Sequence, residues 1–334
     1  MAATDLVDPQ GRIVRDLRVS VTDRCNFRCT YCMPEEGMAW LPRSEVLTFE
    51  EIERIARVCV ERFGFTGIRI TGGEPTVRAH LPVLVSKLAA LGTDLSMTTN
   101  GTSLRLLAHE LREAGLQRIN ISLDTLQRDR FVELTRRDAL EATLDGIAAA
   151  LGAGFAPVKV NCVVMRGVND DEVVDLACWA REVGVVMRFI EFMPLDADGA
   201  WTDEQVVPAS EIVQRIGAVF PLEAFVERGA QPAQRWRYVD GGGAPGSGEV
   251  GVVASVTQSF CSSCDRVRLT ADGQFRSCLF ATTETDLRPV LRGGGNDDAL
   301  ARAISGDVAT KWAGHSIGQP VFLRPSRSMS QIGG

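Results

Sequence analysis

Short β-branched runs alternate with amphipathic helical stretches from about residue 17 to residue 194, and this alternation restricts the chain to few folds. Repeated βα units build a parallel sheet, because each helix carries the chain back to the start of the next strand. The sequence predicts six strands, at 17–23, 67–73, 94–100, 118–125, 157–165 and 187–194. Six βα units form an incomplete TIM-like barrel, because a full barrel needs eight. We therefore expect an α/β fold with an open side that another part of the chain covers.

The carboxy-terminal part has a different pattern. Helices are predicted at 209–216, 286–292 and 297–312, a strand at 250–257, and a hairpin around Asp272-Gly273. The stretch 228–248 contains so many glycines that it predicts a mobile loop. These features predict two domains, an incomplete barrel over 11–217 and a smaller α+β domain over 218–334 that covers its open side.

Composition narrows the functional classes. The nine cysteines are an odd number, and no secretory segment or long apolar run precedes or interrupts them, so we expect a cytoplasmic protein without disulfides or a membrane span. A formal net charge of −7 disfavours a nucleic-acid-binding surface but leaves room for a small basic pocket. Cys59, Cys162 and Cys178 lie in apolar patterns and are predicted to be buried core residues.

Three cysteines follow the first predicted strand directly. Cys25, Cys29 and Cys32 have C-x3-C-x2-C spacing, and the loops that follow barrel strands form the active face. A structural zinc site needs four ligands, and the three histidines of the chain are distant in sequence. Three thiolates on a four-iron cluster would instead leave one iron open for another ligand. The spacing therefore favours an iron-sulfur cluster over zinc.

Small polar groups follow the next three strands. Gly72-Gly73-Glu74, Thr98-Thr99-Asn100 and Ser122-Leu123-Asp124 could each be an ordinary turn or helix cap. Their occurrence at consecutive strand ends is typical of the mouth of a barrel that binds a ligand.

A second cysteine set lies near the carboxy terminus. Cys261, Cys264 and Cys278 again supply three thiols, and zinc with His315 as a fourth ligand is an equally good interpretation of this set alone. Between them, Arg266 and Arg268 would share one face of a strand, which suits either a solvated face or recognition of a polyphosphate.

The first cysteine set and the Gly-Gly-Glu motif resemble the signature of the radical S-adenosylmethionine (SAM) superfamily. The resemblance implies that Cys25, Cys29 and Cys32 hold a 4Fe-4S cluster whose open iron binds SAM, the source of a 5′-deoxyadenosyl radical. The residues that match SAM contacts of this family are Tyr31, Gly73, Ser122 and Met193.

Together with the second cysteine set, several further segments resemble the GTP 3′,8-cyclase family of molybdenum cofactor biosynthesis. They include Leu17-Arg18-Val19-Ser20, Val158-Lys159-Val160-Asn161, Arg188-Phe189-Ile190-Glu191 and the terminal Gly333-Gly334. The resemblance implies that a second 4Fe-4S cluster on Cys261, Cys264 and Cys278 binds the guanine, and that the radical abstracts the ribose 3′ hydrogen before C3′ bonds to C8. It also implies that the Gly-Gly tail enters the active site. The residues that match GTP contacts are Arg18, Arg69, Thr98, Lys159, Arg266, Val267 and Arg268.

The family further implies an electron donor, whose identity the sequence does not give, and a downstream cyclic pyranopterin monophosphate synthase as the consumer of the product. The assembly of the chain stays open, with a homodimer as one candidate. Two other functions compete: a radical SAM enzyme that modifies a peptide, and a zinc-stabilised binding module. The first would not need Lys159, Arg266 and Arg268 together, and the second would be colourless and contain zinc.

Overall fold

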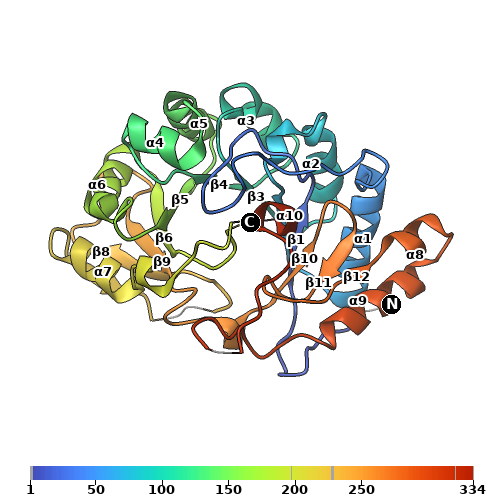
Figure 1. Ribbon diagram of the computed structural model, residues 1–334. Coiled ribbons are helices and arrows are strands. Elements are labelled where there is room, and N and C mark those ends of the chain that lie inside the picture. Colours follow the sequence, from blue (N-terminus) through green and yellow to red (C-terminus); the bar gives the residue numbers. More distant parts are fainter. Residues whose placement is uncertain (1–2, 197, 227–228, 320, 334) are drawn as a thin grey trace.

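A single twelve-stranded sheet organises the chain, seen here in a computed structural model that describes residues 3–196, 198–226, 229–319 and 321–333. Its central strands all pair in parallel. In spatial order they are β10 (Arg266–Leu269), β1 (Asp16–Ser20), β2 (Gly67–Thr71), β3 (Asp94–Thr99), β4 (Arg118–Ser122), β5 (Lys159–Val164), β6 (Val186–Glu191) and β9 (Glu249–Val253). The strands curve around a central space with the helices outside (Figure 1).

Antiparallel strands extend both edges of this sheet. β11 (Gln274–Arg276) and β12 (Thr285–Asp286) follow β10, while β8 (Gln234–Tyr238) and β7 (Leu222–Ala224) follow β9. The carboxy-terminal part therefore shares the sheet of the barrel: it adds strands beside both β1 and β6. Figure 1 shows its orange and red segments crossing the lower side of the view.

Apart from α10 (Met329–Ile332), which lies inside the ring of strands, the helices occupy the outer side of the parallel strands (Figure 1). They are α1 (Phe49–Phe63), α2 (Leu81–Ala89), α3 (Leu104–Glu113), α4 (Arg128–Thr135), α5 (Leu140–Gly152), α6 (Val173–Val183), α7 (Ala209–Gly217), α8 (Arg288–Arg292) and α9 (Asp297–Val308). Short 3-10 turns are η1 (Pro75–Val77), η2 (Asp170–Glu172), η3 (Asp203–Gln205) and η4 (Cys261–Ser263). No helix in these ranges is long and apolar enough to cross a membrane.

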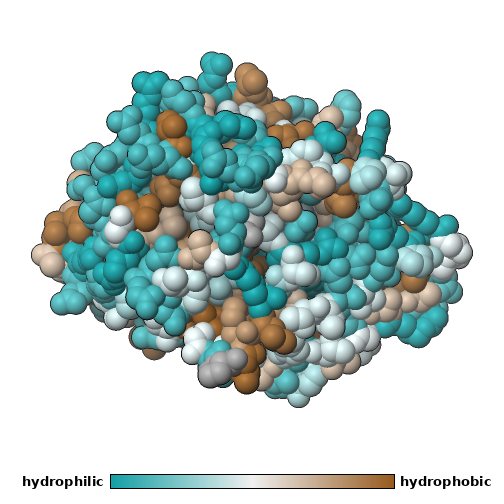
Figure 2. Space-filling model, viewed as in Figure 1, coloured by the Kyte–Doolittle hydropathy of each residue, from teal (hydrophilic) through white to brown (hydrophobic). Residues whose placement is uncertain are grey.

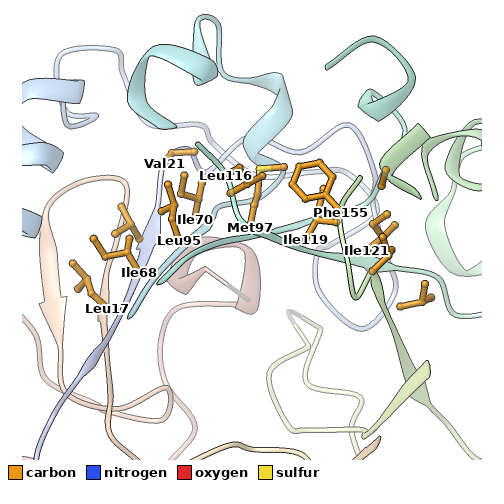
Figure 3. Packing of buried hydrophobic residues seen from close by; sticks show 14 of the residues in the cluster. Leu17, Val21, Ile68, Ile70, Leu95, Met97, Leu116, Ile119, Ile121 and Phe155 are labelled. Carbon is orange, nitrogen blue, oxygen red and sulfur yellow. The ribbon is translucent and has the colours of Figure 1, made fainter. Parts of the chain in front are cut away.

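Strand alternation separates the core from the cavity. Leu17, Ile68, Leu95 and Ile119 point outward and pack under the helices, as Figure 3 shows for β1 to β4. The intervening positions face the inside of the barrel, because side chains along a strand alternate between its two faces. Polar residues such as Arg18 can therefore line the interior without disrupting the hydrophobic core.

All six predicted strands are present, and four of them end two or three residues earlier than predicted. A capping box begins α1: Thr48 Oγ1 accepts from the Glu51 N–H at 3.2 Å, and Glu51 Oε2 accepts from the Thr48 N–H at 2.8 Å. The hairpin around Asp272-Gly273 is confirmed as the turn between β10 and β11. Cys59 and Cys162 are buried as predicted, but Cys178 is partly exposed on α6, so the prediction for Cys178 is wrong.

The prediction of a mobile loop over 228–248 is also wrong where the structure describes it. Gln234–Tyr238 form β8, and the glycine-rich part packs on the end of α6. There the carbonyl of Arg181 accepts hydrogen bonds from the Ala244 N–H at 2.7 Å and from Ser247 Oγ at 3.2 Å. Glycine fits because a Cβ on Gly243 would lie 2.3 Å from the same carbonyl oxygen. The glycines thus permit close packing rather than disorder.

Most of the molecular face seen in Figure 1 is hydrophilic, and hydrophobic residues gather mainly at its lower edge (Figure 2).

Candidate active site

A cavity of about 270 Å³ lies inside the ring of strands. Its walls come from the loops after β1 to β4, from the interiors of β5, β6, β9 and β10, and from the carboxy-terminal tail. Predicted site residues from segments far apart in sequence share this cavity: Arg18, Cys25, Cys29, Tyr31, Cys32, Arg69, Gly73, Thr98, Ser122, Met193, Arg266 and Arg268.

The loop after β1 presents the first cysteine set to the cavity. A turn brings Cys29 and Cys32 together, since the Cys29 carbonyl accepts from the Cys32 N–H at 2.9 Å. Arg28 anchors the loop by donating to the Cys25 carbonyl at 2.7 Å and by lying over the Trp40 ring. The loop is therefore held independently of any bound group.

Burial raises the pKa of all three thiols. It raises the pKa of Cys25 to about 11, helped by the charge of Glu74, and the pKa of Cys32 to about 12, helped by Cys25. The pKa of Cys29 is also well above its usual value, through burial and the nearby Cys32. A cationic metal centre would reverse these shifts, because it stabilises the thiolates that ligate it. These thiols therefore fit a metal cluster better than free nucleophiles.

No three His, Cys, Asp or Glu side chains within the described ranges converge on one point as ligands of a single metal ion do. A cluster distributes its thiolates over different irons, so its ligands do not have to converge on one atom.

The predicted SAM contacts all line the cavity, but the Gly-Gly-Glu motif has a structural role as well. A Cβ on Gly73 would lie 2.4 Å from the Arg24 carbonyl oxygen, so the crossing of two loops requires glycine there. The buried Glu74 carboxylate accepts from Thr99 Oγ1 at 2.7 Å and from the Asn100 N–H at 2.7 Å. Glu74 thereby ties the loop after β2 to the loop after β3.

Arginines from three adjacent strands meet on the cavity wall. The register places Arg18 of β1 beside Arg69 of β2 on one side and beside Arg268 of β10 on the other. Arg266 of β10 also faces the cavity and lies over the Phe260 ring. Like charges on directly neighbouring strands destabilise a sheet. Asp16, whose Oδ1 lies 3.8 Å from Arg18 Nε, offsets only part of the charge of these four arginines.

The electrostatics of these arginines are unusual for buried cations. Burial lowers the pKa of Arg18 to about 9, and repulsion from Arg69 and Arg266 contributes. Burial also lowers the pKa of Arg69 to about 10. Within the described structure, the buried Nε atoms of Arg18, Arg69 and Arg266, and Nη2 of Arg266, have no hydrogen-bond partner. Several guanidinium donors are thus available to a polyanion in the cavity.

Lys159 and Val267 lie apart from this cluster. Lys159 begins β5 and lines a second hollow with Arg235 and Glu249 at the opposite end of the strands. Burial, and then repulsion from Arg188 and Arg118, lowers the pKa of Lys159 to about 8. Val267 packs in the core on the outer face of β10, so only its backbone can face the cavity.

The second cysteine set lies around the start of β10 and the end of β11. Arg12 donates to the Cys261 carbonyl at 2.5 Å, and Lys311 Nζ donates to the carbonyls of Arg266 and Ser277 at 2.5 Å each. Burial raises the pKa of Cys261, but hydrogen bonds from His315 outweigh it, and the pKa falls to about 7. His315 is therefore close to this set, as the zinc alternative requires.

The second set adjoins the arginines. Burial, and then repulsion from Arg18, lowers the pKa of Arg268 well below its usual value, while the charges of Cys278 and Cys264 raise it in part. The charge of Cys264 also raises the pKa of Arg18. The arginines thus lie within electrostatic reach of the second cysteine set while lining the cavity that the first set shares.

The tail enters the barrel. The Gly333 carbonyl accepts a hydrogen bond from Arg268 Nη1, and a Cβ on Gly333 would lie 2.5 Å from Thr71 Oγ1. Gly333 has φ +86°, which also favours glycine. Gly334, the other predicted tail residue, lies outside the described residues.

Comparison with known proteins gives the family. Residues 19–180 match the Radical SAM superfamily and residues 185–317 match Molybdenum Cofactor Synthesis C. A "GTP 3′,8-cyclase" of Streptomyces coelicolor is 51% identical over 333 residues, covering 98% of this chain and 96% of that protein. The chain belongs to the GTP 3′,8-cyclase family. Two further relatives are "GTP 3′,8-cyclase" of Corynebacterium glutamicum, 49% identical over 98% of this chain and 89% of that protein, and "GTP 3′,8-cyclase 2" of Mycobacterium tuberculosis, 48% identical over 98% and 92%.

Solved structures agree on the fold of this GTP 3′,8-cyclase family member. Streptococcus suis SuiB bound to S-adenosylmethionine has a TM-score of 0.58 at 13% identity, covering 89% of this chain and 69% of SuiB. At that identity the likeness shows a shared fold and nothing about substrate.

Three polar residues of this family member's site were not singled out by the sequence analysis as contacts. Arg188 of β6 lines the cavity, and the amide oxygens of Asn161 and Asn120 hold its guanidinium at 2.9 Å. Asp124 accepts from Tyr31 Oη at 2.6 Å, and burial raises the pKa of Asp124 to about 6. Lys311 is buried beside the second cysteine set. A charged residue between apolar neighbours, as Arg188 is between Met187 and Phe189, was the available signal.

Proposed function

We propose that this chain is a GTP 3′,8-cyclase that converts GTP to (8S)-3′,8-cyclo-7,8-dihydroguanosine 5′-triphosphate, the first step of molybdenum cofactor biosynthesis. The observation that carries this proposal is the group of buried arginines with unpaired donors in a cavity that the first cysteine set lines. Phe260 and Leu279, which are next in sequence to Cys261 and Cys278 of the second set, line the same cavity. A triphosphate supplies the several negative charges that Arg18, Arg69, Arg266 and Arg268 need. All three relatives named above carry the name of this activity.

Cys25, Cys29 and Cys32 would hold one 4Fe-4S cluster, and Cys261, Cys264 and Cys278 a second. SAM bound at the first cluster would supply the 5′-deoxyadenosyl radical. Tyr31, Gly73, Ser122 and Met193 would contact SAM, and Asp124 would orient the Tyr31 hydroxyl through their hydrogen bond. Thr98 and Arg188 would join the arginines at GTP, with Lys159 and the backbone at Val267 on its periphery.

Enclosure would serve this chemistry, since a reactive carbon radical must be kept from solvent. We propose that the carboxy-terminal part, 218–334, covers the open side of the barrel formed by 11–217. The tail supports this arrangement, because Met329 and Ser330 line the cavity and the Gly333 carbonyl accepts a hydrogen bond from Arg268. Gly333 and Gly334 would complete the site.

The same proposal places the protein in the cytoplasm, with an electron donor and with cyclic pyranopterin monophosphate synthase as the next enzyme. We also propose that the chain forms a homodimer, which light scattering tests.

The competing activity is radical-dependent modification of a peptide, for which a triphosphate would be irrelevant. The test is a titration of the anaerobically reconstituted protein with GTP, followed by reduction with SAM and detection of 5′-deoxyadenosine and cyclised nucleotide. Arg69→Met should weaken GTP binding roughly 10- to 100-fold, the loss of one or two charged hydrogen bonds. It should not lower the unfolding midpoint of the free protein, because Arg69 Nε has no partner there. Product formation without GTP dependence, or Arg69→Met that binds GTP normally, would reject the proposal.

A further inference from the structure

The last described residues lie between the two halves of the candidate site. Figure 1 shows α10 inside the ring of strands, beside β1. Ser330 forms hydrogen bonds with Cys32 of the first set, while the carbonyl of Gly333 accepts from Arg268 next to the second set. The position of this short segment therefore affects both sides of the cavity.

Helix α10 cannot hold this position through its own helical structure. It contains four residues, and a single helical turn is unstable in water because nucleation is unfavourable. Its capping box between Ser328 and Gln331 is local, and Ile332 is its one fully buried hydrophobic side chain. Met329 is only partly buried, against the small cluster of Leu195, Phe280 and Ile317. Something outside the helix must therefore fix where the segment begins.

Arg327, immediately before the helix, provides that attachment. Its Nη2 donates to Asp272 Oδ2 at 2.9 Å and to Glu284 Oε1 at 2.7 Å, and its Nε donates to Glu284 Oε2 at 2.9 Å. The Arg327 side chain is 19% exposed and that of Asp272 is 9% exposed, so water weakens these contacts less than on an open surface. A guanidinium that bridges two carboxylates is also a strong directional contact.

The two carboxylates belong to the part of the chain that carries the second cysteine set. Asp272 lies in the turn between β10 and β11, whose strands carry Arg268 and lead to Cys278. Glu284 follows that cysteine and also accepts from the buried Arg276 at 2.6 Å. Arg327 therefore joins the tail to the hairpin that frames the second set.

We propose that Arg327 is a positioning residue: by clamping the chain to Asp272 and Glu284 it holds Met329–Gly333 inside the barrel. Loss of the clamp releases the tail while the sheet and both cysteine sets stay folded. A catalytic role of the ordered tail rests on the proposed function, but the attachment of the tail by Arg327 does not.

The test is amide hydrogen exchange of the reconstituted full-length chain, measured by mass spectrometry without SAM or GTP. The Gln331, Ile332 and Gly333 N–H groups are bonded within the tail, at 3.1, 3.2 and 3.0 Å, so they report its order. Arg327→Met should accelerate exchange over 329–333 at least tenfold and leave α9 unchanged. Arg327→Lys should retain part of the protection, because an ammonium cannot reproduce the fork that reaches both carboxylates.

Arg237→Met is the matched control, because it removes an arginine that pairs with Glu223 at 2.7 Å on the exposed β8–β7 edge, with no contact to the tail. Glu284→Gln removes the charge of one of the two carboxylates that accept from Arg327, and it should accelerate exchange of the same amides. Unchanged exchange over 329–333 in Arg327→Met would overturn the proposal. Equal acceleration over the tail, the β10–β11 hairpin and α9 would also overturn it, since Arg327 would then stabilise the region as a whole. Because no turnover is measured, failure here is separate from failure of the proposed function.

Discussion

Buried cations that line the cavity are the most informative residues of the chain. Arg18, Arg69 and Arg268 occupy adjacent register positions, where mutual repulsion makes the free protein less stable than it would be with apolar residues. A sheet optimised for stability alone would place apolar or paired residues at these positions. Their presence indicates a binding site whose favourable energy is realised when the ligand arrives.

Lys159 should make the affinity for GTP depend on pH. Its pKa of about 8 lies below the usual value near 10.4, so the free protein binds its proton weakly. A triphosphate would favour the charged ammonium. GTP affinity should therefore be full below pH 8 and fall as the pH rises above it, by at most about tenfold per pH unit, with proton uptake on binding. Stability of the free protein should change in the opposite sense, rising through the same window.

Calorimetric titration in buffers of different ionisation enthalpy measures both the affinity and the proton uptake. Lys159→Met should remove the fall in affinity that begins near pH 8, whereas Lys87→Met, which removes a surface lysine paired with Glu53 at 2.7 Å, should keep it. A fall that begins only at higher pH would belong to Arg18 and Arg69, whose pKa values are about 9 and about 10. Proton uptake that persists in Lys159→Met would assign the effect to another group.

At the scale of elements, the carboxy-terminal tail has little room for added side-chain volume. Gly333→Ala would place its Cβ 2.5 Å from Thr71 Oγ1 at a positive φ, so the helix α10 should lose its place. We expect product formation to fall at least tenfold while iron content stays unchanged, and deletion of both terminal glycines to have the same effect. Gly217→Ala is the control, because nothing lies within 4 Å of the added methyl group. Normal turnover of Gly333→Ala would contradict a role for the tail.

The elements also show how far local patterns could predict the structure. The six βα strands were predictable because their β-branched runs are bounded by turns and helices, and the cysteine sets because their spacing is local. Arg188 was missed as a contact because one arginine between apolar neighbours does not reveal which face of the strand it occupies. The pairing of β1 with β10 was not predictable, since it joins residues about 250 positions apart that share no local signal.

At the scale of the whole molecule, this pairing unites the functional parts. Strands β10 and β9 lie beside β1 and β6, so the carboxy-terminal part forms both edges of the parallel sheet. Arg266 and Arg268 consequently enter the barrel beside Arg18, although they belong to the part of the chain that holds the second cysteine set. Both cysteine sets and the arginines between them depend on one continuous sheet.

The most direct test of this account is the iron and acid-labile sulfide content of anaerobically purified protein. Two four-iron clusters require about eight irons and eight sulfides per chain. Replacing Cys25 or Cys278 with alanine should reduce each value to about four, because either change removes a ligand of one cluster. Zinc in place of iron, or about four irons that only the Cys25 variant loses, would contradict the two-cluster site at the centre of this account.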